Sequence, residues 1–86
     1  MKTNDESENK TFLGGDRVKK RLFASSTICE VTYDNVVEHM VVVFQNGSKY
    51  EYFAIDQELA DGLFNAVSAG QYFAKNIRPF KKGKRL

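Results

Sequence analysis

One histidine and one cysteine, His39 and Cys29, leave few kinds of catalytic or metal site open to this sequence. Zinc sites usually need four Cys or His ligands, and this pair cannot supply them. A Cys29–His39 pair could act as nucleophile and base, but a cysteine in a strand-like segment is commonly a small core residue. Ser25 and Ser26 lack the glycine-flanked setting of a nucleophilic serine and are typical of a turn.

Other signatures of small-molecule chemistry are also missing. Gly14-Gly15 and Gly47 do not fall in the strand–glycine–helix context of a phosphate-binding loop. The seven acids between residues 22 and 74 are scattered, without the paired spacing of a glycosidase or a two-metal site. We therefore expect no catalytic residues, no metal, no cofactor and no enzymatic activity.

Aromatic side chains indicate binding instead. The chain has seven Phe and four Tyr, and Tyr50 and Tyr52 share one face of a strand-like segment. On an open sheet such a pair can stack nucleic-acid bases, whereas a pair that faces a helix belongs to the core, and the sequence leaves both open. Tyr72 and Phe73 adjoin basic residues on a helical segment, and we expect Phe73 in the core and Tyr72 at the contact surface.

The formal net charge of +2 conceals an uneven distribution. Residues 1–16 carry −2, residues 17–21 carry +4, residues 22–74 carry −6 and residues 75–86 carry +6. Basic flanks on an acidic body suggest phosphate contacts, although terminal charges can also serve solubility alone. The candidate phosphate contacts are Arg17, Lys19, Lys20, Arg21, Lys75, Arg78, Lys81, Lys82, Lys84 and Arg85.

The chain's 86 residues make one small domain at most. No apolar run approaches the ~18 residues of a membrane span, the N-terminus has no apolar signal segment, and a single cysteine fits a reducing compartment. We expect a soluble, cytoplasmic protein without a membrane partner, either a monomer or a small homo-oligomer. Residues 1–16 should form a disordered tail, residues 17–79 the domain and residues 80–86 a basic tail.

Alternating hydrophobicity predicts strands near residues 27–33, 36–45 and 48–55. Asp34-Asn35 supplies turn chemistry between the first two. Asn46-Gly47 is the strongest short hairpin signal, because both residues tolerate positive φ. These three segments predict an antiparallel meander.

The same alternation assigns faces. Ile28 should lie on the opposite face from Val31 and Tyr33. Val41 and Val43 make the second face of the middle strand apolar as well, which indicates a central strand that is covered on both sides.

The pattern changes to helical spacing after Asp56, a predicted N-cap. We expect Ser68-Ala69-Gly70 to end the first helix, with Gly70 as a positive-φ cap, and Pro79 to stop a second short helix. The predicted fold class is α+β, with the three-stranded meander packed against two short C-terminal helices. An extra N-terminal edge strand is an open alternative.

Several motifs resemble one known family. They are Ser25-Ser26-x-Ile28, Val31-Thr32-Tyr33-Asp34, Met40-x-Val42-x-Phe44-x-x-Gly47-x-x-Tyr50-x-Tyr52 and Leu63-Phe64-x-Ala66-x-Ser68-x-Gly70-x-Tyr72-Phe73-x-x-x-Ile77-Arg78. Their order and spacing closely resemble the KTSC domain, a module named after the C-terminus of some lysyl-tRNA synthetases. This chain has Asp56 and Val67 where the family often has proline, and Ala74 where it often has asparagine. These departures change the helix start and a turn but not the sheet, and Ala74 weakens any carry-over of a site there.

The resemblance implies an α+β module with no established activity, for which the link to a synthetase suggests RNA binding. Our first hypothesis is a non-enzymatic module that binds RNA or other single strands, with Tyr50, Tyr52 or Tyr72 stacking a base. The second is a protein-interaction module of a small phage or mobile-element protein, which docks on a host complex through its acidic body or a sheet edge. A pocket for a small nucleotide-like ligand between sheet and helices is a third.

Overall fold

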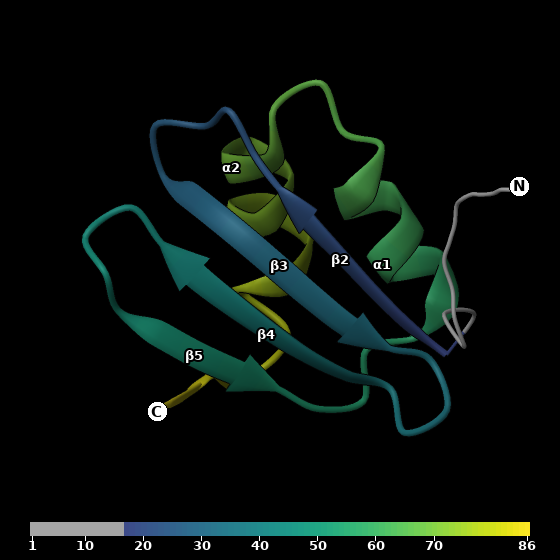
Figure 1. Cartoon of the computed structure of the whole chain (residues 1–86). Coiled ribbons are helices and arrows are strands. Elements are labelled where there is room, and N and C mark those ends of the chain that lie inside the picture. The colour runs from purple at the N-terminus through teal and green to yellow at the C-terminus, as the bar shows by residue number, and fades with distance from the viewer. Residues whose placement is uncertain (1–16) are drawn as a thin grey trace, which may run out of the picture.

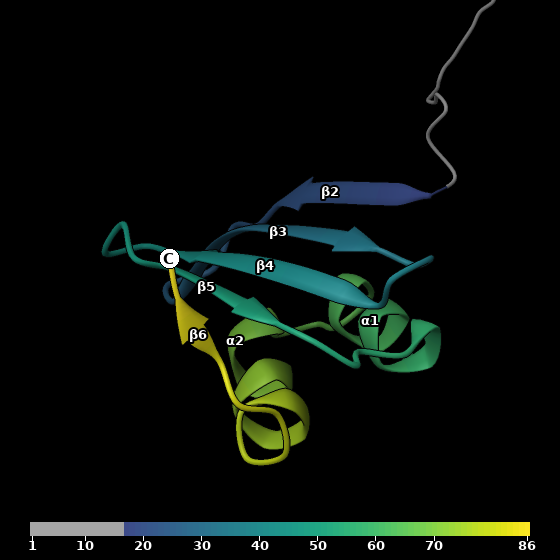
Figure 2. The same cartoon turned by 90° about the horizontal axis from the view of Figure 1, so that it is seen from below.

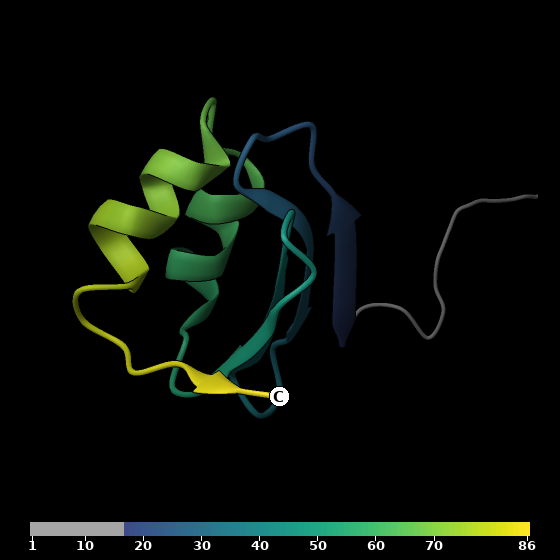
Figure 3. The same cartoon turned by 90° about the vertical axis from the view of Figure 1, so that its left-hand side faces the viewer.

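The computed structural model describes residues 17–86, so the tail expected over residues 1–16 lies outside the described residues. Five antiparallel strands form one sheet in chain order, and the helical segments lie against one of its faces (Figures 1 and 3). The elements are β2 (Val18–Leu22), β3 (Ile28–Asp34), β4 (His39–Phe44), β5 (Lys49–Tyr52), α1 (Gln57–Phe64), α2 (Ala69–Tyr72), the π-helical turn η1 (Phe73–Ile77) and β6 (Lys84–Arg85). The α+β prediction is confirmed, but the three-stranded meander is smaller than the observed five-stranded sheet.

The two outer strands have no alternating pattern that sequence reasoning could use. All five residues of β2 are exposed. This strand is the extra N-terminal strand that the sequence analysis considered as an alternative. The two-residue strand β6 pairs with β5 and runs alongside it at the opposite edge (Figure 2). Part of the segment expected to be a basic tail therefore belongs to the sheet.

Local turn chemistry forms the hairpins as predicted. Asp34 Oδ1 accepts hydrogen bonds from the backbone N–H groups of Val36 and Val37, at 2.9 and 3.4 Å, which closes the β3–β4 turn. Gly47 has a φ of 91° in the β4–β5 turn, and its N–H donates to the carbonyl of Phe44 at 2.9 Å. Glycine suits this position because its backbone adopts positive φ without steric cost.

A bulge in β3 overturns the predicted face of Ile28. The register with β4 shifts between Ile28 and Glu30, so that the alternation restarts within the strand. A bulge inserts one extra residue and reverses which side chains point inward beyond it. Ile28 is therefore fully buried on the same face as Val31 and Tyr33.

The core lies between the sheet and the helices. Met40 and Val42 of the central strand β4 are fully buried there, whereas Val41 and Val43 on its other face are half-buried. The helices cover only one face of the sheet (Figure 3), so the prediction that β4 is covered on both sides is wrong. The hydroxyl of Tyr33 donates to the carbonyl of Ile55 at 2.6 Å, which satisfies a buried polar group.

The helices begin at capping side chains. Asp56 caps α1 as predicted, because its carboxylate accepts from the N–H of Leu59 at 2.8 Å. Ser68 does not end that helix but caps the next one, since its Oγ accepts from the N–H of Gln71 at 3.3 Å. Gly70 lies inside α2 and is not a positive-φ cap. No helix among residues 17–86 combines the length and hydropathy needed to cross a membrane.

Candidate functional site

The bases of β2 have partners within the fold. Arg17 Nε lies 3.0 Å from Asp34 Oδ2, and Lys20 Nζ lies 3.6 Å from Glu30 Oε2, so two cations are matched by acids of the neighbouring strand. Lys19 Nζ lies 3.6 Å from Asp61 Oδ1 of α1. Such exposed pairs contribute little stability each, but they neutralise much of the charge of this strand.

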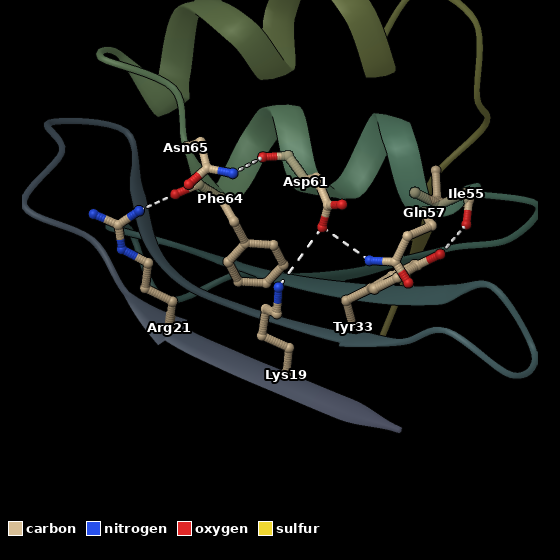
Figure 4. Close-up of polar contacts among 8 residues, drawn as sticks. All are labelled: Lys19, Arg21, Tyr33, Ile55, Gln57, Asp61, Phe64 and Asn65. Atoms are coloured by element: carbon tan, nitrogen blue, oxygen red, sulfur yellow. Dashed lines mark hydrogen bonds and ion pairs between the residues drawn. The ribbon is translucent and has the colours of Figure 1, made fainter. Parts of the chain in front are cut away.

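Lys19 and Arg21 also attach β2 to the end of α1 (Figure 4). The ammonium of Lys19 lies 5.4 Å from the ring centre of Phe64, and the guanidinium of Arg21 donates to the Phe64 carbonyl. The Arg21 guanidinium also stacks over the ring of Phe23 at 4.6 Å. The N-terminal basic run is thus largely engaged in holding an edge strand against a helix.

The C-terminal bases are placed differently. Arg78, Lys81 and Lys82 form no ion pair with any residue in the described range, and all three line a surface pocket of about 660 Å³. We call this the basic pocket. It lies between the β4–β5 hairpin and the α2–η1 segment, and its lining residues are Thr27, Phe44, Asn46, Ser48, Tyr50, Tyr52, Gly70, Phe73, Ala74, Arg78, Lys81, Lys82 and Gly83.

Tyr50 and Tyr52 both contribute to this pocket but differ in exposure. Tyr50 is half-buried, and its ring meets Phe44 edge-on at 5.8 Å. Tyr52 is only 4% exposed, and its ring packs edge-on against Phe73 at 5.5 Å. Tyr52 is therefore a core residue with no ring face free for stacking, whereas Tyr50 remains partly accessible.

Tyr52 lines the basic pocket, and its hydroxyl has no hydrogen-bond partner among residues 17–86. Burial raises the pKa of this hydroxyl, Tyr50 adds to the rise, and the charge of Arg78 opposes it. A buried tyrosine hydroxyl usually finds a partner. Its position beside the pocket is therefore a second feature, besides the cations, that fits a polar ligand.

Tyr72 lies away from the basic pocket. Its hydroxyl donates to the carbonyl of Leu59 at 3.1 Å, and burial raises its pKa. Its hydroxyl and ring also occupy the space above Gly62, where a Cβ would come within 2.0 Å of the hydroxyl oxygen. Tyr72 therefore packs α2 against α1, which does not suit the contact role expected of it, while Phe73 is buried as expected.

A second pocket of about 620 Å³ adjoins the first. Thr27, Gly70 and Ala74 line both pockets, so the two meet where α2 approaches the β2–β3 loop. Its other lining residues are Arg21, Phe23, Ala24, Ser25, Ser26, Ala66, Val67, Ser68, Ala69 and Gln71. We call this the serine pocket. Neither pocket has an acidic residue in its lining.

The acidic side chains lie elsewhere. Asp34 and Glu30 are paired with β2, Asp61 faces Lys19 from α1, and Glu51 Oε1 lies 2.9 Å from His39 Nε2. None of the seven acids of residues 22–74 lines either pocket. The fold therefore keeps acidic side chains out of both pocket linings.

His39 and Cys29 form no assembled pair. His39 pairs with Asp34 in the strand register, at the far end of β3 from Cys29, and its ring packs 4.9 Å from Phe53. Within residues 17–86, no three His, Cys, Asp or Glu side chains are grouped to hold a metal ion.

The structure therefore divides the candidate contacts into groups. Tyr50, Tyr52, Arg78, Lys81 and Lys82 meet at one pocket. Lys84 and Arg85 lie on the adjacent strand β6, and Lys75 is exposed outside both pockets. Lys19, Lys20 and Arg21 lie on β2, and Arg17 directly precedes it. Sequence reasoning missed the polar lining residues Asn46 and Ser48, because a hairpin turn signal does not reveal which pocket the turn will border.

Comparisons with known proteins agree with this architecture. A family model described as the KTSC domain matches residues 24–80. A lysine–tRNA ligase of Trichormus variabilis is 41% identical over 53 residues, and one of Nostoc punctiforme is 37% identical over 53 residues. Each match covers 62% of this chain and 9% of the ligase, so the chain spans a small part of those relatives. The crystal structure of a KTSC domain protein from Yersinia pestis superposes with a TM-score of 0.73 at 21% identity, covering 80% of this chain and 97% of that one, which shows a shared fold.

Proposed function

This chain belongs to the KTSC domain family, and from that premise we propose that it is a non-enzymatic module that binds RNA or other single-stranded nucleic acid. The family relationship supports this proposal only indirectly. The two ligases that match the chain act on tRNA by name, and the matching segment is 9% of their length. Fold similarity alone does not carry function, so the proposal depends on the site.

One observation carries the proposal. Arg78, Lys81 and Lys82 line a pocket that contains no acid, and they lack ion-pair partners in the described part of the chain. Three unneutralised cations beside a partly exposed tyrosine match the two components of single-strand binding, which are phosphate attraction and base stacking. Arg85 of β6 pairs with Tyr50 in the strand register and therefore extends the basic surface on the same face of the sheet.

The concave shape favours single strands over duplex. Tyr50 is half-buried within the pocket, so a base can reach its ring only if the base is unpaired and unstacked from its neighbours. Single-stranded segments offer such bases, whereas a duplex hides them. Binding would therefore require one base to enter the pocket while the adjoining phosphates meet the lysines.

A salt titration tests the proposal. Each phosphate contact to a single strand contributes a slope of roughly −0.7 in a plot of log affinity against log salt, so three contacts predict roughly −2. The measurement is fluorescence anisotropy of labelled random-sequence single-stranded RNA between low and physiological salt. A flat salt dependence, or no binding at low salt, would contradict the proposal.

A protein-interaction module is the second candidate, and the open edge of β2 favours it. All five residues of β2 are exposed, and within residues 17–86 this strand pairs with β3 alone. An extended segment of a partner could add a strand at this edge. Docking through the acidic body has less support, because Asp34, Glu30 and Asp61 are already paired with Arg17, Lys20 and Lys19. A pull-down with and without nuclease separates the candidates, since a partner retained after nuclease supports this one.

A further inference from the structure

The basic pocket and the serine pocket are neighbours on one side of the molecule. Three residues line both of them, namely Thr27 of the β2–β3 loop and Gly70 and Ala74 of the α2–η1 segment. Their volumes of about 660 and 620 Å³ each fall within the usual size of a ligand site. Together they form one path from the lysines of the C-terminal segment to Arg21.

We propose that this path is the track of a single nucleic-acid strand, and that the serine pocket is a second subsite for the next nucleotide. This inference rests on the proposed function, because the basic pocket supplies the first contacts. It adds a second binding site, a minimum ligand of two consecutive nucleotides, and the course of the bound strand over the surface.

Gly70 and Thr27 meet at the boundary between the two pockets. A Cβ at position 70 would lie 3.2 Å from Thr27 Oγ1 and 3.3 Å from Thr27 Cβ, so α2 already lies against the β2–β3 loop here. The proposed strand crosses over this contact, and a longer side chain at Gly70 would stand in its way. Glycine has low helix propensity, so its place inside α2 is explained by this close approach rather than by the helix itself.

The serine pocket offers hydrogen-bond donors for a polar ligand. Ser25 Oγ accepts from the N–H groups of Thr27 and Ile28, both at 3.1 Å, and Ser68 Oγ accepts from Gln71, so each hydroxyl retains its proton to donate. Ser26 is exposed, and its side chain makes no hydrogen bond within residues 17–86. Phosphate and base oxygens are acceptors, which suits this donor set.

A cation and an aromatic ring also lie at the far end of the path. Arg21 stacks over Phe23 at 4.6 Å and donates one N–H to the Phe64 carbonyl. A guanidinium has five N–H donors, so others remain for a phosphate. Each pocket lining therefore contains both cations and an aromatic ring, Arg21 with Phe23 in one and Lys81 and Lys82 with Tyr50 in the other, as expected for two successive nucleotide subsites.

The decisive variant is Ser26→Trp, which fills the serine pocket and leaves the basic pocket intact. Val36→Trp is the matched control, because Val36 is 64% exposed in the β3–β4 turn at the opposite end of the sheet. The full chain is titrated at low salt with labelled oligouridylates of two and eight nucleotides and with an eight-base-pair RNA duplex. Circular dichroism and thermal melting establish that each variant is folded, and Ala24→Trp replaces Ser26→Trp if the latter is not.

We expect Ser26→Trp to weaken binding of both the two-nucleotide and the eight-nucleotide strand about fivefold or more, the low end of one stacked base, because two consecutive nucleotides already occupy both subsites. At each length the number of binding registers is the same for both proteins, so the ratio of the wild-type affinity to the variant affinity isolates the second subsite. Val36→Trp should match wild type at both lengths.

Failure of this inference is distinguishable from failure of the proposed function. Equal binding of Ser26→Trp and wild type to the longer strand overturns the second subsite and leaves the basic pocket standing. Duplex binding as tight as single-strand binding also overturns the track. If wild type binds neither oligonucleotide, or if Lys82→Ala changes neither affinity nor salt dependence, the proposed function fails as well.

Discussion

Gly83 lies directly over the ring of Tyr52, so close that a Cβ at position 83 would come within 2.6 Å of Cε2 and Cζ of the tyrosine. This contact brings the C-terminal segment down onto the core. It is followed at once by β6, whose Lys84 and Arg85 pair with Glu51 and Tyr50 of β5. The contact between Gly83 and Tyr52, which are far apart in the sequence, therefore positions the lysines of the basic pocket.

Gly83→Ala should destabilise the fold and weaken RNA binding together. The added methyl overlaps a buried ring that is 4% exposed, and overpacking of this kind costs about 1–3 kcal/mol. Chemical denaturation measures the stability, and anisotropy at a temperature where the variant is folded measures binding. Wild-type stability and wild-type affinity in this variant would contradict the close packing of Gly83 on the Tyr52 ring.

Lys82→Ala and Lys20→Ala should differ although each removes one positive charge. Lys82 lines the basic pocket without an ion-pair partner in the described range, whereas Lys20 Nζ lies 3.6 Å from Glu30. We expect Lys82→Ala to reduce the magnitude of the salt slope by roughly 0.7 and Lys20→Ala to leave it unchanged. Equal effects of the two variants would mean that net charge, and not the pocket, attracts the RNA.

Tyr50→Leu should weaken binding of single-stranded RNA roughly tenfold, within the range for one stacked base. Leucine keeps an apolar contact with Phe44, whose ring lies 5.8 Å from that of Tyr50, so the fold should persist. The measurement is anisotropy beside a thermal melt. Unchanged affinity in a folded Tyr50→Leu protein would remove stacking from the mechanism while leaving the phosphate contacts.

Tyr72→Phe is the contrasting tyrosine variant. It removes the hydroxyl that donates to the Leu59 carbonyl at 3.1 Å and keeps the ring against Gly62. We expect a loss of about 1 kcal/mol in the free energy of unfolding and no change in RNA affinity. A binding defect in this variant, measured well below its melting temperature, would place Tyr72 in the site after all.

Asp34 should make stability depend on acid pH. Partial burial alone would raise its pKa, but hydrogen bonds from the backbone N–H of Val36, from Arg17 and from the N–H of Val37 outweigh that effect and lower it. Because the folded-state pKa lies below the unfolded value of about 3.9, this contribution is present above pH ~4 and is lost as the pH falls through the folded pKa. Asp34→Asn should therefore be less stable than wild type at pH 7, with the gap in the free energy of unfolding closing as the pH falls through the lowered pKa of Asp34 in denaturation experiments. A gap that is constant with pH would contradict this assignment.

The sequence by itself determined the features that depend on neighbouring residues. The Asp56 cap, the Asp34-Asn35 turn and the Asn46-Gly47 hairpin each act within three or four positions, so their chemistry can be identified from the chain. The hydrophobic alternation likewise identified the central strands, and the motif spacing identified the family. The predicted face of Ile28 was wrong because a one-residue bulge reverses the alternation without leaving a signature in the sequence.

The tertiary structure alone decided which charges are available. The sequence shows two basic flanks of similar composition, yet Lys19 meets Asp61 and Arg17 meets Asp34, while Lys81 and Lys82 find no acid within the described residues. It also decided that Tyr52 is buried, that Tyr72 faces α1, and that two pockets share Gly70. The physical reason is that ion pairing, burial and pocket shape depend on distances through space, and those distances are set only when strands and helices from distant parts of the chain pack together.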